Sequence, residues 1–139
     1  MERHIRQTII PGWGEEGQKK VAAATVFIAG AGGLGSPAAL YLAAAGVGTI
    51  RLCDDGEVEL SNLNRQILYD ERDIGTAKAI RAAEKLSRID PGVTVTPLTE
   101  RIDDEAVERL IGNADIVVDC LDNFEARYVL NPWAVKKRK

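Results

Sequence analysis

Four glycines follow an apolar segment in the stretch FIAGAGGLGS, residues 27–36. Gly30, Gly32 and Gly35 have the G-x-G-x-x-G spacing, which predicts a tight turn, a close approach of backbone to phosphate and close packing of the following helix. Gly33 lies inside the same turn. Because backbone N–H groups at the start of a helix bind phosphates, the turn predicts a nucleotide site. It does not distinguish a dinucleotide from a nucleoside triphosphate.

Two cations favour the triphosphate. Asp54 ends the next apolar segment and is placed to accept from a ribose hydroxyl, which a dehydrogenase would explain. Arg65 lies with Asn62 in a long loop at 55–74, and Lys78 lies in the first turn of a helix expected from about residue 75. A dehydrogenase does not explain either cation. A cation at a helix N-terminus is unfavourable unless an anion lies nearby. Arginine and lysine at these positions therefore indicate bound phosphates.

A carboxylate follows the last apolar segment, in DCLDN at 119–123. Asp122 beside phosphates suits Mg²⁺, which takes one or two protein carboxylates and keeps its other ligands as water or phosphate. Asp119 is the alternative ligand, and a plain turn residue is the alternative role for Asp122. Together these residues predict attack by a substrate carboxylate on the α-phosphate of ATP, with Arg65 and Lys78 stabilising the departing pyrophosphate.

Alternating strands and helices must position these residues. Strands are expected at 25–30, 49–54, 93–98 and 115–120, and helices at 18–24, 37–47, 75–89, 103–112 and from 124. The first strand has no polar alternation, which indicates burial on both faces. The pattern predicts an α/β fold, a doubly wound, Rossmann-like, mostly parallel sheet with helices on both faces and ligands at the carboxyl ends of the strands.

Length and composition predict one domain. Residues 1–24 form an N-terminal arm and helix, with a break at 11–17, and residues 25–139 form the Rossmann-like core. The net charge of −3 gives no basic field for nucleic acid, and no apolar run is long enough for a membrane span. Two cysteines, Cys53 and Cys120, are too few for a disulfide framework, so a cytoplasmic protein is expected, with both thiols packed as small apolar groups. The single histidine, His4, is expected to be solvated in the arm.

Six blocks in order carry a resemblance to a known family: RHIRQ (3–7), GQKKV (17–21), GAGGLGS (30–36), DDGEVELSNLNRQ (54–66), IGTAKA (74–79) and DCLDN (119–123). The sequence resembles the ThiF/MoeB/HesA family of adenylating enzymes, which are related to ubiquitin-activating enzyme. The resemblance implies ATP, Mg²⁺ and a homodimer. It also implies adenylation of the C-terminal Gly-Gly carboxylate of a ubiquitin-like sulfur-carrier protein of the molybdopterin or thiamine type.

The resemblance also implies roles for single residues. Asp54 would bind ribose, Asp122 would hold the metal with Asn123 beside it, and Arg6 would reach into the site of the neighbouring subunit. Lys78 would bind phosphates together with the loop residues Ser61, Asn62, Leu63, Asn64 and Arg65.

The sequence departs from the family at two places. Gly56 stands where the family often has a second aspartate, and Asp55 is the neighbouring carboxylate that could replace it. Family members of full length continue beyond the equivalent of residue 139, so the chain is expected to lack their C-terminal portion and its zinc-binding cysteines, and no zinc is expected. An exposed sheet edge is expected for the same reason. The alternative functions are a truncated, non-catalytic nucleotide-binding or dimerisation module and an NAD-dependent oxidoreductase.

Overall fold

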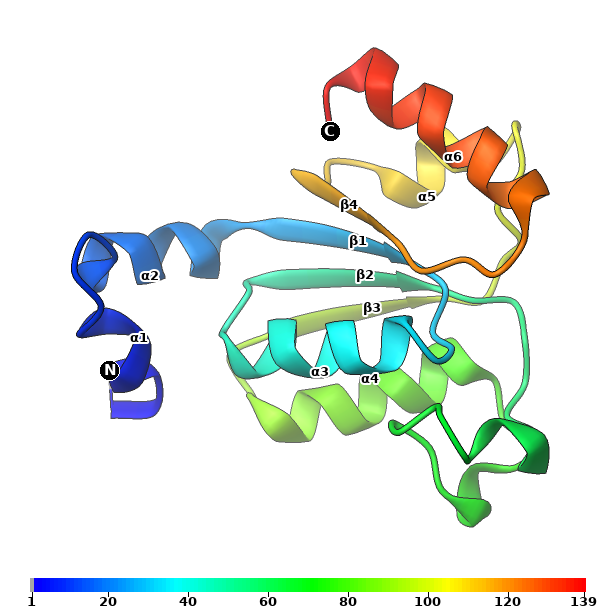
Figure 1. The fold of residues 1–139 in the computed structure, drawn as a ribbon, viewed down its shortest axis with the longest axis horizontal. Helices are drawn as coiled ribbons and strands as arrows, with labels where there is room; N and C mark the ends of the chain where they lie inside the picture. Colours follow the sequence, from blue (N-terminus) through cyan, green and yellow to red (C-terminus); the bar gives the residue numbers. More distant parts are fainter. Residues whose placement is uncertain (1) are drawn as a thin grey trace.

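Four parallel strands form the centre of the molecule. The computed structural model describes residues 2–139. Strands β1 (Thr25–Ala29), β2 (Thr49–Cys53), β3 (Thr94–Leu98) and β4 (Ile116–Asp119) lie in the order β3-β2-β1-β4 (Figure 1). Ala29 pairs with Cys53 on one side and with Asp119 on the other, so these strands end at the same level. The order reverses between β1 and β4, and ligands bind at such a reversal in open parallel sheets.

Helices cover both faces of the sheet, as predicted. Helices α3 (Gly35–Ala44) and α4 (Lys78–Ile89) pack on one face, and α5 (Val107–Ile111) and α6 (Phe124–Lys137) on the other (Figure 1). Residues of β1 alternate between the two cores: Val26 and Ile28 face α3 and α4, and Phe27 faces α5 and α6. All three side chains are at most 3% exposed, which confirms the predicted burial of β1 on both faces.

The N-terminal residues form short helices that pack on the core. Residues Glu2–His4 make a 3-10 turn, η1, followed by α1 (Ile5–Thr8) and α2 (Gly14–Ala23). Only residues 11–13 break the helical structure, because residues 14–17 already belong to α2. The ring of Trp13 packs against α2 and lies 3.0 Å from where a Cβ on Gly17 would be. Glu15 and Glu16 in the first turn of α2 suit the positive end of the helix dipole.

Polar contacts tie this N-terminal segment to the C-terminal ends of α3 and α4. Gln7 Nε2 donates to the carbonyl of Ala45 at 3.1 Å and to Gln18 Oε1 at 2.8 Å. His4 Nε2 lies 3.1 Å from Asp90 Oδ2, and the His4 side chain is only 18% exposed. The prediction of a solvated His4 is wrong, because Asp90 and Gly46 form a site for its ring.

Two helices begin later than predicted. Helix α5 starts at Val107 instead of 103, because Asp103 Oδ1 accepts from the backbone N–H groups of Glu105 and Ala106 and first closes a turn. Helix α4 starts at Lys78 because Gly75 has φ +81° and its N–H donates to the carbonyl of Val58 at 2.8 Å. The backbone therefore closes a loop before the helix begins.

The long connection from β2 to α4 is held at its two ends. Lys78 N–H donates to the carbonyl of Gly56 at 3.0 Å, and Val58 N–H donates to the carbonyl of Thr76 at 2.9 Å. Between these ties lie two 3-10 turns, η2 (Leu60–Asn62) and η3 (Glu71–Asp73). The buried side chain of Tyr69 anchors the loop to the core. Its residues are thereby fixed beside the glycine turn.

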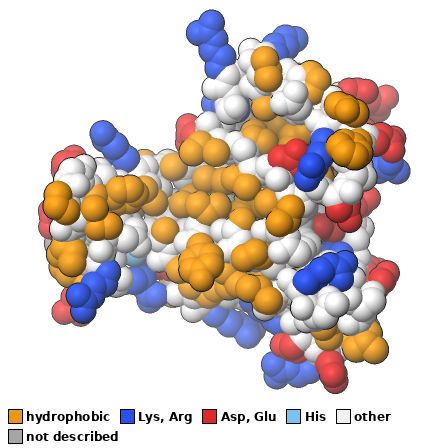
Figure 2. Space-filling view, viewed as in Figure 1, with side chains coloured by type: hydrophobic (Ala, Val, Ile, Leu, Met, Phe, Trp, Pro, Cys, Tyr) orange, Lys and Arg blue, Asp and Glu red, His pale blue; other side chains and the backbone are white. Residues whose placement is uncertain are grey.

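The strand β4 lies at one edge of the sheet. Within residues 2–139 it pairs only with β1, and Ile116 is 53% exposed. Figure 2 shows apolar side chains across the middle of the face where β4 and α3 lie in Figure 1. An exposed edge was expected from the resemblance. Across residues 2–139, the structure contains no helix of the length and apolarity needed to traverse a bilayer.

Candidate nucleotide site

A cavity of about 740 Å³ lies at the carboxyl ends of the strands, where the strand order reverses. It brings together residues that are far apart in the sequence. The predicted residues that line it are Gly30, Gly32, Gly33, Asp54, Arg65, Lys78, Asp122 and Asn123. Because a doubly wound sheet places its ligand at this position, the cavity is the candidate functional site.

Glycine is required at two positions of the turn. Gly30 has φ +95°, and a Cβ on it would lie 2.7 Å from the carbonyl oxygen of Cys120. A Cβ on Gly35 would lie 1.9 Å from the carbonyl oxygen of Gly30, so α3 starts in direct contact with the turn. These contacts fix the N-terminus of α3 at the wall of the cavity.

Free backbone donors face this wall. The amide groups of Gly32, Gly33 and Leu34 donate to no acceptor within residues 2–139. Side chains of the long loop lie across the same residues: Arg65 Cγ is 3.4 Å from the position of a Cβ on Gly33. Unpaired N–H groups at a helix N-terminus attract an anion.

Asp54 joins the glycine turn to the long loop. Its Oδ2 accepts from the N–H of Ala31 at 2.7 Å, and its Oδ1 accepts from the N–H of Gly56 at 2.8 Å. A carboxylate has about four acceptor positions, so two remain for the ribose hydroxyls that the sequence predicted. Asp54 therefore orients the turn as well as lining the cavity.

Arg65 and Lys78 are unpaired cations. Within residues 2–139 neither has a carboxylate oxygen within 4.0 Å. Arg65 Nη1 donates instead to the carbonyl of Ser61 and to Asn64 Oδ1, both at 3.1 Å. Lys78 is the first residue of α4, and its Nζ lies 3.6 Å from the position of a Cβ on Gly56. Two unpaired cations beside a row of free N–H groups favour a polyanionic ligand.

The other cations of the cavity are neutralised. Arg101 Nη2 lies 3.3 Å from Glu125 Oε2. Arg127 lies 3.6 Å from Asp119 Oδ1 and donates twice to the carbonyl of Leu121, at 3.0 and 2.6 Å. Arg127 therefore holds the connection between β4 and α6 that carries Asp122.

Several predicted site residues do not line the cavity: Gly35, Ser61, Asn62, Leu63 and Asn64. Ser61 and Asn64 hold the guanidinium of Arg65. Asn62 Oδ1 accepts from the N–H of Glu59 at 3.1 Å and closes the turn η2. Direct phosphate contacts from these residues stay predictions.

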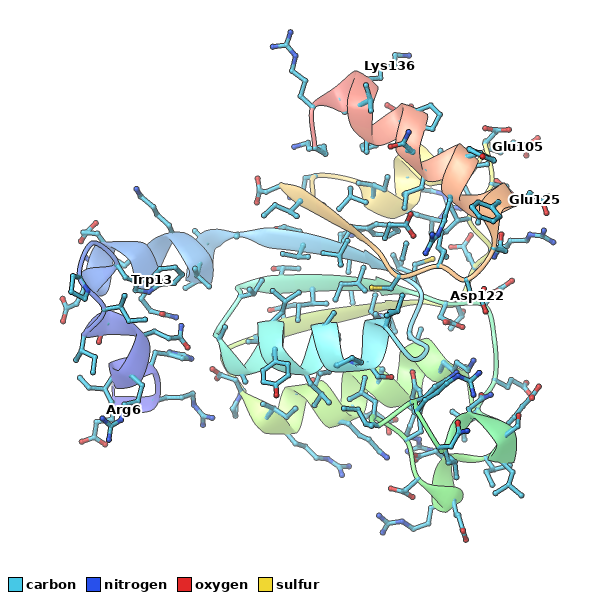
Figure 3. The ribbon with its side chains drawn as sticks, viewed as in Figure 1. Arg6, Trp13, Glu105, Asp122, Glu125 and Lys136 are labelled. Atoms are coloured by element: carbon cyan, nitrogen blue, oxygen red, sulfur yellow. The ribbon has the colours of Figure 1, made fainter. Side chains whose placement is uncertain are left out.

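Arg6 lies at the opposite end of the molecule from Asp122 (Figure 3). It is exposed and belongs to the N-terminal segment that packs on the ends of α3 and α4. It therefore cannot serve the cavity of its own chain in this conformation, and its predicted role in a neighbouring subunit stays a prediction.

Asp122 is an exposed carboxylate at the cavity. Asn123 follows it and caps α6, because its Oδ1 accepts from the N–H of Ala126 at 2.9 Å. Residues 2–139 contain no group of three or more histidine, cysteine, aspartate or glutamate side chains that could hold a metal. The single exposed carboxylate of Asp122 at the cavity fits a metal that takes one protein carboxylate and most of its ligands from phosphate and water, as Mg²⁺ does.

Some residues that line the cavity were not predicted from the sequence, and they are of two kinds. Glu100, Arg101 and Ile102 follow β3 and could have been found by the rule that ligand-binding residues follow strand ends. Gln66 gave no signal, because a glutamine beside an arginine in a loop is typical of a solvated surface. In the structure it is buried and lines the cavity.

Cys53 also lines the cavity, from the end of β2. Its Sγ donates to the carbonyl of Glu100 at 3.2 Å. Burial, with a smaller contribution from Asp54, raises the pKa of this thiol from 9.0 to about 12. The thiol is therefore protonated at neutral pH, and the structure supports the prediction that Cys53 packs as a small apolar group.

Comparison with known proteins gives a consistent picture. The model of the ThiF family matches residues 4–139. A vegetative HesA protein of Trichormus variabilis is 42% identical over 139 residues, which are 100% of this chain and 52% of that protein. The sulfur carrier protein ThiS adenylyltransferase of Escherichia coli is 43% identical over 133 residues, which are 96% of this chain and 53% of that enzyme. The chain thus spans about half the length of the curated relatives it matches.

Similar solved structures include nucleotide complexes. E. coli tRNA N6-threonylcarbamoyladenosine dehydratase in complex with ATP has a TM-score of 0.92 and 29% identity, covering 99% of this chain and 56% of that chain. The same enzyme in complex with AMP has a TM-score of 0.87 and 31% identity, covering 91% of this chain and 52% of that chain. Adenine nucleotides are thus known ligands of proteins with this fold.

Proposed function

The chain belongs to the ThiF family, and on this premise we propose that it transfers AMP from ATP to the C-terminal carboxylate of a ubiquitin-like sulfur-carrier protein, with release of pyrophosphate. One observation carries the proposal: the unpaired Arg65 and Lys78 share a cavity with the free N–H groups of the glycine turn and with Asp122. Adenylyltransferases among the relatives support the reaction class.

The reaction needs no nucleophile from the protein. An oxygen of the carrier's terminal carboxylate attacks the α-phosphorus, and the bond between that phosphorus and the bridging oxygen to the β-phosphate breaks. The bridging oxygen leaves with the electron pair as part of pyrophosphate. Arg65 and Lys78 bind the β- and γ-phosphates and stabilise the negative charge that develops there. The protein contributes positioning and electrostatic stabilisation.

The remaining roles follow the geometry of the cavity. Asp54 binds the ribose while it holds Ala31 and Gly56. Asp122 would hold Mg²⁺ together with phosphate oxygens and water. The metal, when bound, neutralises phosphate charge and orients the triphosphate for in-line displacement. Arg127 keeps Asp122 in place through the carbonyl of Leu121.

ATP–pyrophosphate exchange tests the reaction. With a carrier that ends in Gly-Gly, the chain should exchange labelled pyrophosphate into ATP, and Arg65→Ala or Lys78→Ala should reduce the exchange by at least about a hundredfold. Lys136→Ala is the matched control, because Lys136 is exposed on α6 away from the cavity (Figure 3). Carriers of the thiamine and the molybdopterin types are assayed separately, and the pathway is assigned to the one that supports exchange.

Measurements of nucleotide binding beside the exchange assay separate the alternative functions. Binding of ATP without exchange for any carrier would identify a non-catalytic nucleotide-binding module. Binding of NADH in place of ATP would identify an oxidoreductase. Either result would refute the proposed adenylyltransferase activity.

A homodimer in which Arg6 enters the partner's cavity is part of the proposal. Its support is the position of Arg6, which is exposed and far from the cavity of its own chain. Arg6→Ala and Lys78→Ala should each abolish exchange. Mixed in equal amounts and allowed to exchange subunits, they should regain about one quarter of wild-type activity, because half the dimers then contain one intact site. No regain on mixing would refute a role for Arg6 across the interface.

A further inference from the structure

We propose that Gln66 is a ligand of the α-phosphate, to which its side-chain amide nitrogen donates a hydrogen bond beside Gly32. The inference rests on the proposed binding of ATP. It adds to the predicted phosphate ligands a neutral donor at the phosphorus where the reaction takes place.

The Gln66 side chain is buried in the wall of the cavity without a partner. The residue is 4% exposed, and its Oε1 is buried with no hydrogen-bond donor in residues 2–139. No hydrogen bond from its Nε2 to a residue of the described chain is formed either. A buried amide is normally hydrogen-bonded, since an unsatisfied one lowers the stability of the fold. The orphaned Oε1 is an acceptor, and a phosphate oxygen does not pair with it; the Nε2 is not among the buried unpaired atoms and stays accessible from the cavity as a free donor.

The amide is directed at the glycine turn. Gln66 Nε2 lies 3.4 Å from where a Cβ on Gly32 would be, which is van der Waals contact, so the amide lies directly over this glycine. The N–H of Gly32 has no acceptor within the described residues. Two kinds of donor, the backbone N–H and the side-chain NH₂, therefore meet at one place, and an anionic oxygen is the group that accepts from both.

The order of contacts along the turn assigns the phosphate. Asp54, the predicted ribose ligand, contacts Ala31. Gln66 lies over Gly32, and Arg65 lies over Gly33. A nucleoside triphosphate extends from ribose through the α-phosphate to the β- and γ-phosphates. Aligned with Asp54 at the ribose, it therefore places its α-phosphate at Gln66 and its outer phosphates toward Arg65.

This position gives Gln66 a role distinct from that of Arg65. The α-phosphate is present in ATP, in the acyl adenylate and in AMP, whereas the β- and γ-phosphates leave as pyrophosphate. A ligand of the α-phosphate stabilises all three bound states, and a ligand of the outer phosphates stabilises ATP alone. The affinity for AMP therefore distinguishes the two residues.

Calorimetric titration of the whole chain with ATP, AMP and adenosine tests the inference. Gln66→Met keeps the length of the side chain and removes the donor, so it should weaken the binding of AMP and of ATP by the same factor, about tenfold or more, and leave adenosine unchanged. Gln66→Glu should weaken both nucleotides further through charge repulsion. Arg65→Ala should weaken the binding of ATP and leave the binding of AMP nearly unchanged.

The titrations overturn the inference if Gln66→Met binds AMP as tightly as the wild type does. They also overturn it if Gln66→Met weakens the binding of adenosine as much as that of AMP. That result is expected if the side chain only supports the fold of the cavity wall. Both outcomes leave the proposed function standing. A wild-type chain that binds neither AMP nor ATP would refute the inference and the proposed function together.

A second measurement needs no variant. The chain contains three glutamines, Gln7, Gln18 and Gln66, and selective ¹⁵N labelling makes their side-chain NH₂ groups visible by NMR. Saturating AMP should shift the Gln66 resonances, and adenosine should not. Gln7 and Gln18 are the internal controls, because they bond to each other and to Ala45 in the N-terminal segment. An unmoved Gln66 signal with AMP bound would overturn the inference.

Discussion

The carbonyl of Ala31 in the glycine turn accepts hydrogen bonds from two buried hydroxyl groups. Removing both hydroxyls should lower the free energy of unfolding by more than the sum of the two single removals. Tyr69 OH donates to it at 2.9 Å and Ser36 Oγ at 3.3 Å. Ala31 and Ser36 are 0% exposed and Tyr69 is 6% exposed, so water does not replace a lost donor. Burial, with smaller contributions from Asp54 and Asp73, holds the pKa of Tyr69 above its usual range. The tyrosine therefore remains a donor at neutral and mildly alkaline pH.

The expected free energies follow from these contacts. Tyr69→Phe leaves the Ser36 bond in place, and Ser36→Ala leaves the Tyr69 bond, so each single variant should lower the free energy of unfolding by about 1 kcal/mol. The double variant leaves the Ala31 carbonyl without either donor, and a buried unsatisfied acceptor costs about 1–3 kcal/mol. The double variant should therefore lose about 3–5 kcal/mol, which exceeds the sum of the single losses by about 1–3 kcal/mol.

Urea unfolding of the four proteins of this cycle measures the coupling. Tyr41→Phe is the matched control, because Tyr41 is 78% exposed and the same hydroxyl is removed there without loss of a buried bond. It should change the free energy of unfolding by less than about 0.5 kcal/mol. Single losses that add within about 0.5 kcal/mol would refute the reasoning, because they would mean that another donor satisfies the Ala31 carbonyl.

Three further predictions concern other parts of the fold. Because the pKa of Cys53 is raised in the folded chain, its contribution to the free energy of unfolding is complete below pH 9 and is lost as the pH rises toward 12. Cys53→Ala should remove this part of the pH dependence of urea unfolding. Gly35→Ala places a Cβ 1.9 Å from the Gly30 carbonyl oxygen and should lower the unfolding free energy by at least about 3 kcal/mol, measured by urea unfolding; a near-neutral variant would contradict the contact. Asp90→Asn removes the carboxylate beside His4 and should speed trypsin cleavage in residues 2–8 severalfold, while an unchanged rate would show that the contact between His4 and Asp90 does not hold this segment.

The sequence predicted the layers of the fold because its signals are local. A continuous apolar run such as β1 indicates a strand buried on both faces, and G-x-G-x-x-G after that strand predicts a phosphate-binding turn. The structure and the family match confirm the doubly wound sheet and the family. The positions of Arg65, Lys78 and Asp122 at a common cavity were also foreseeable, since strand ends and the helix starts beside them meet at one edge of a parallel sheet.

Features that depend on contacts between distant residues were not foreseeable. The strand order β3-β2-β1-β4 is set by which faces pack together, and no motif in the chain encodes it. The contact of His4 with Asp90 was missed, and His4 was expected to be solvated, because the two residues lie far apart in the chain. Gln66 illustrates the same limit. Its residue type is typical of the surface, and only the packing of the long loop against the glycine turn buries its amide and leaves it facing the cavity. Residue type and spacing thus determined the fold class and the chemistry of the glycine turn, whereas tertiary packing decided which polar groups remain unpaired at the site, because desolvation and hydrogen bonding depend on all neighbours in space.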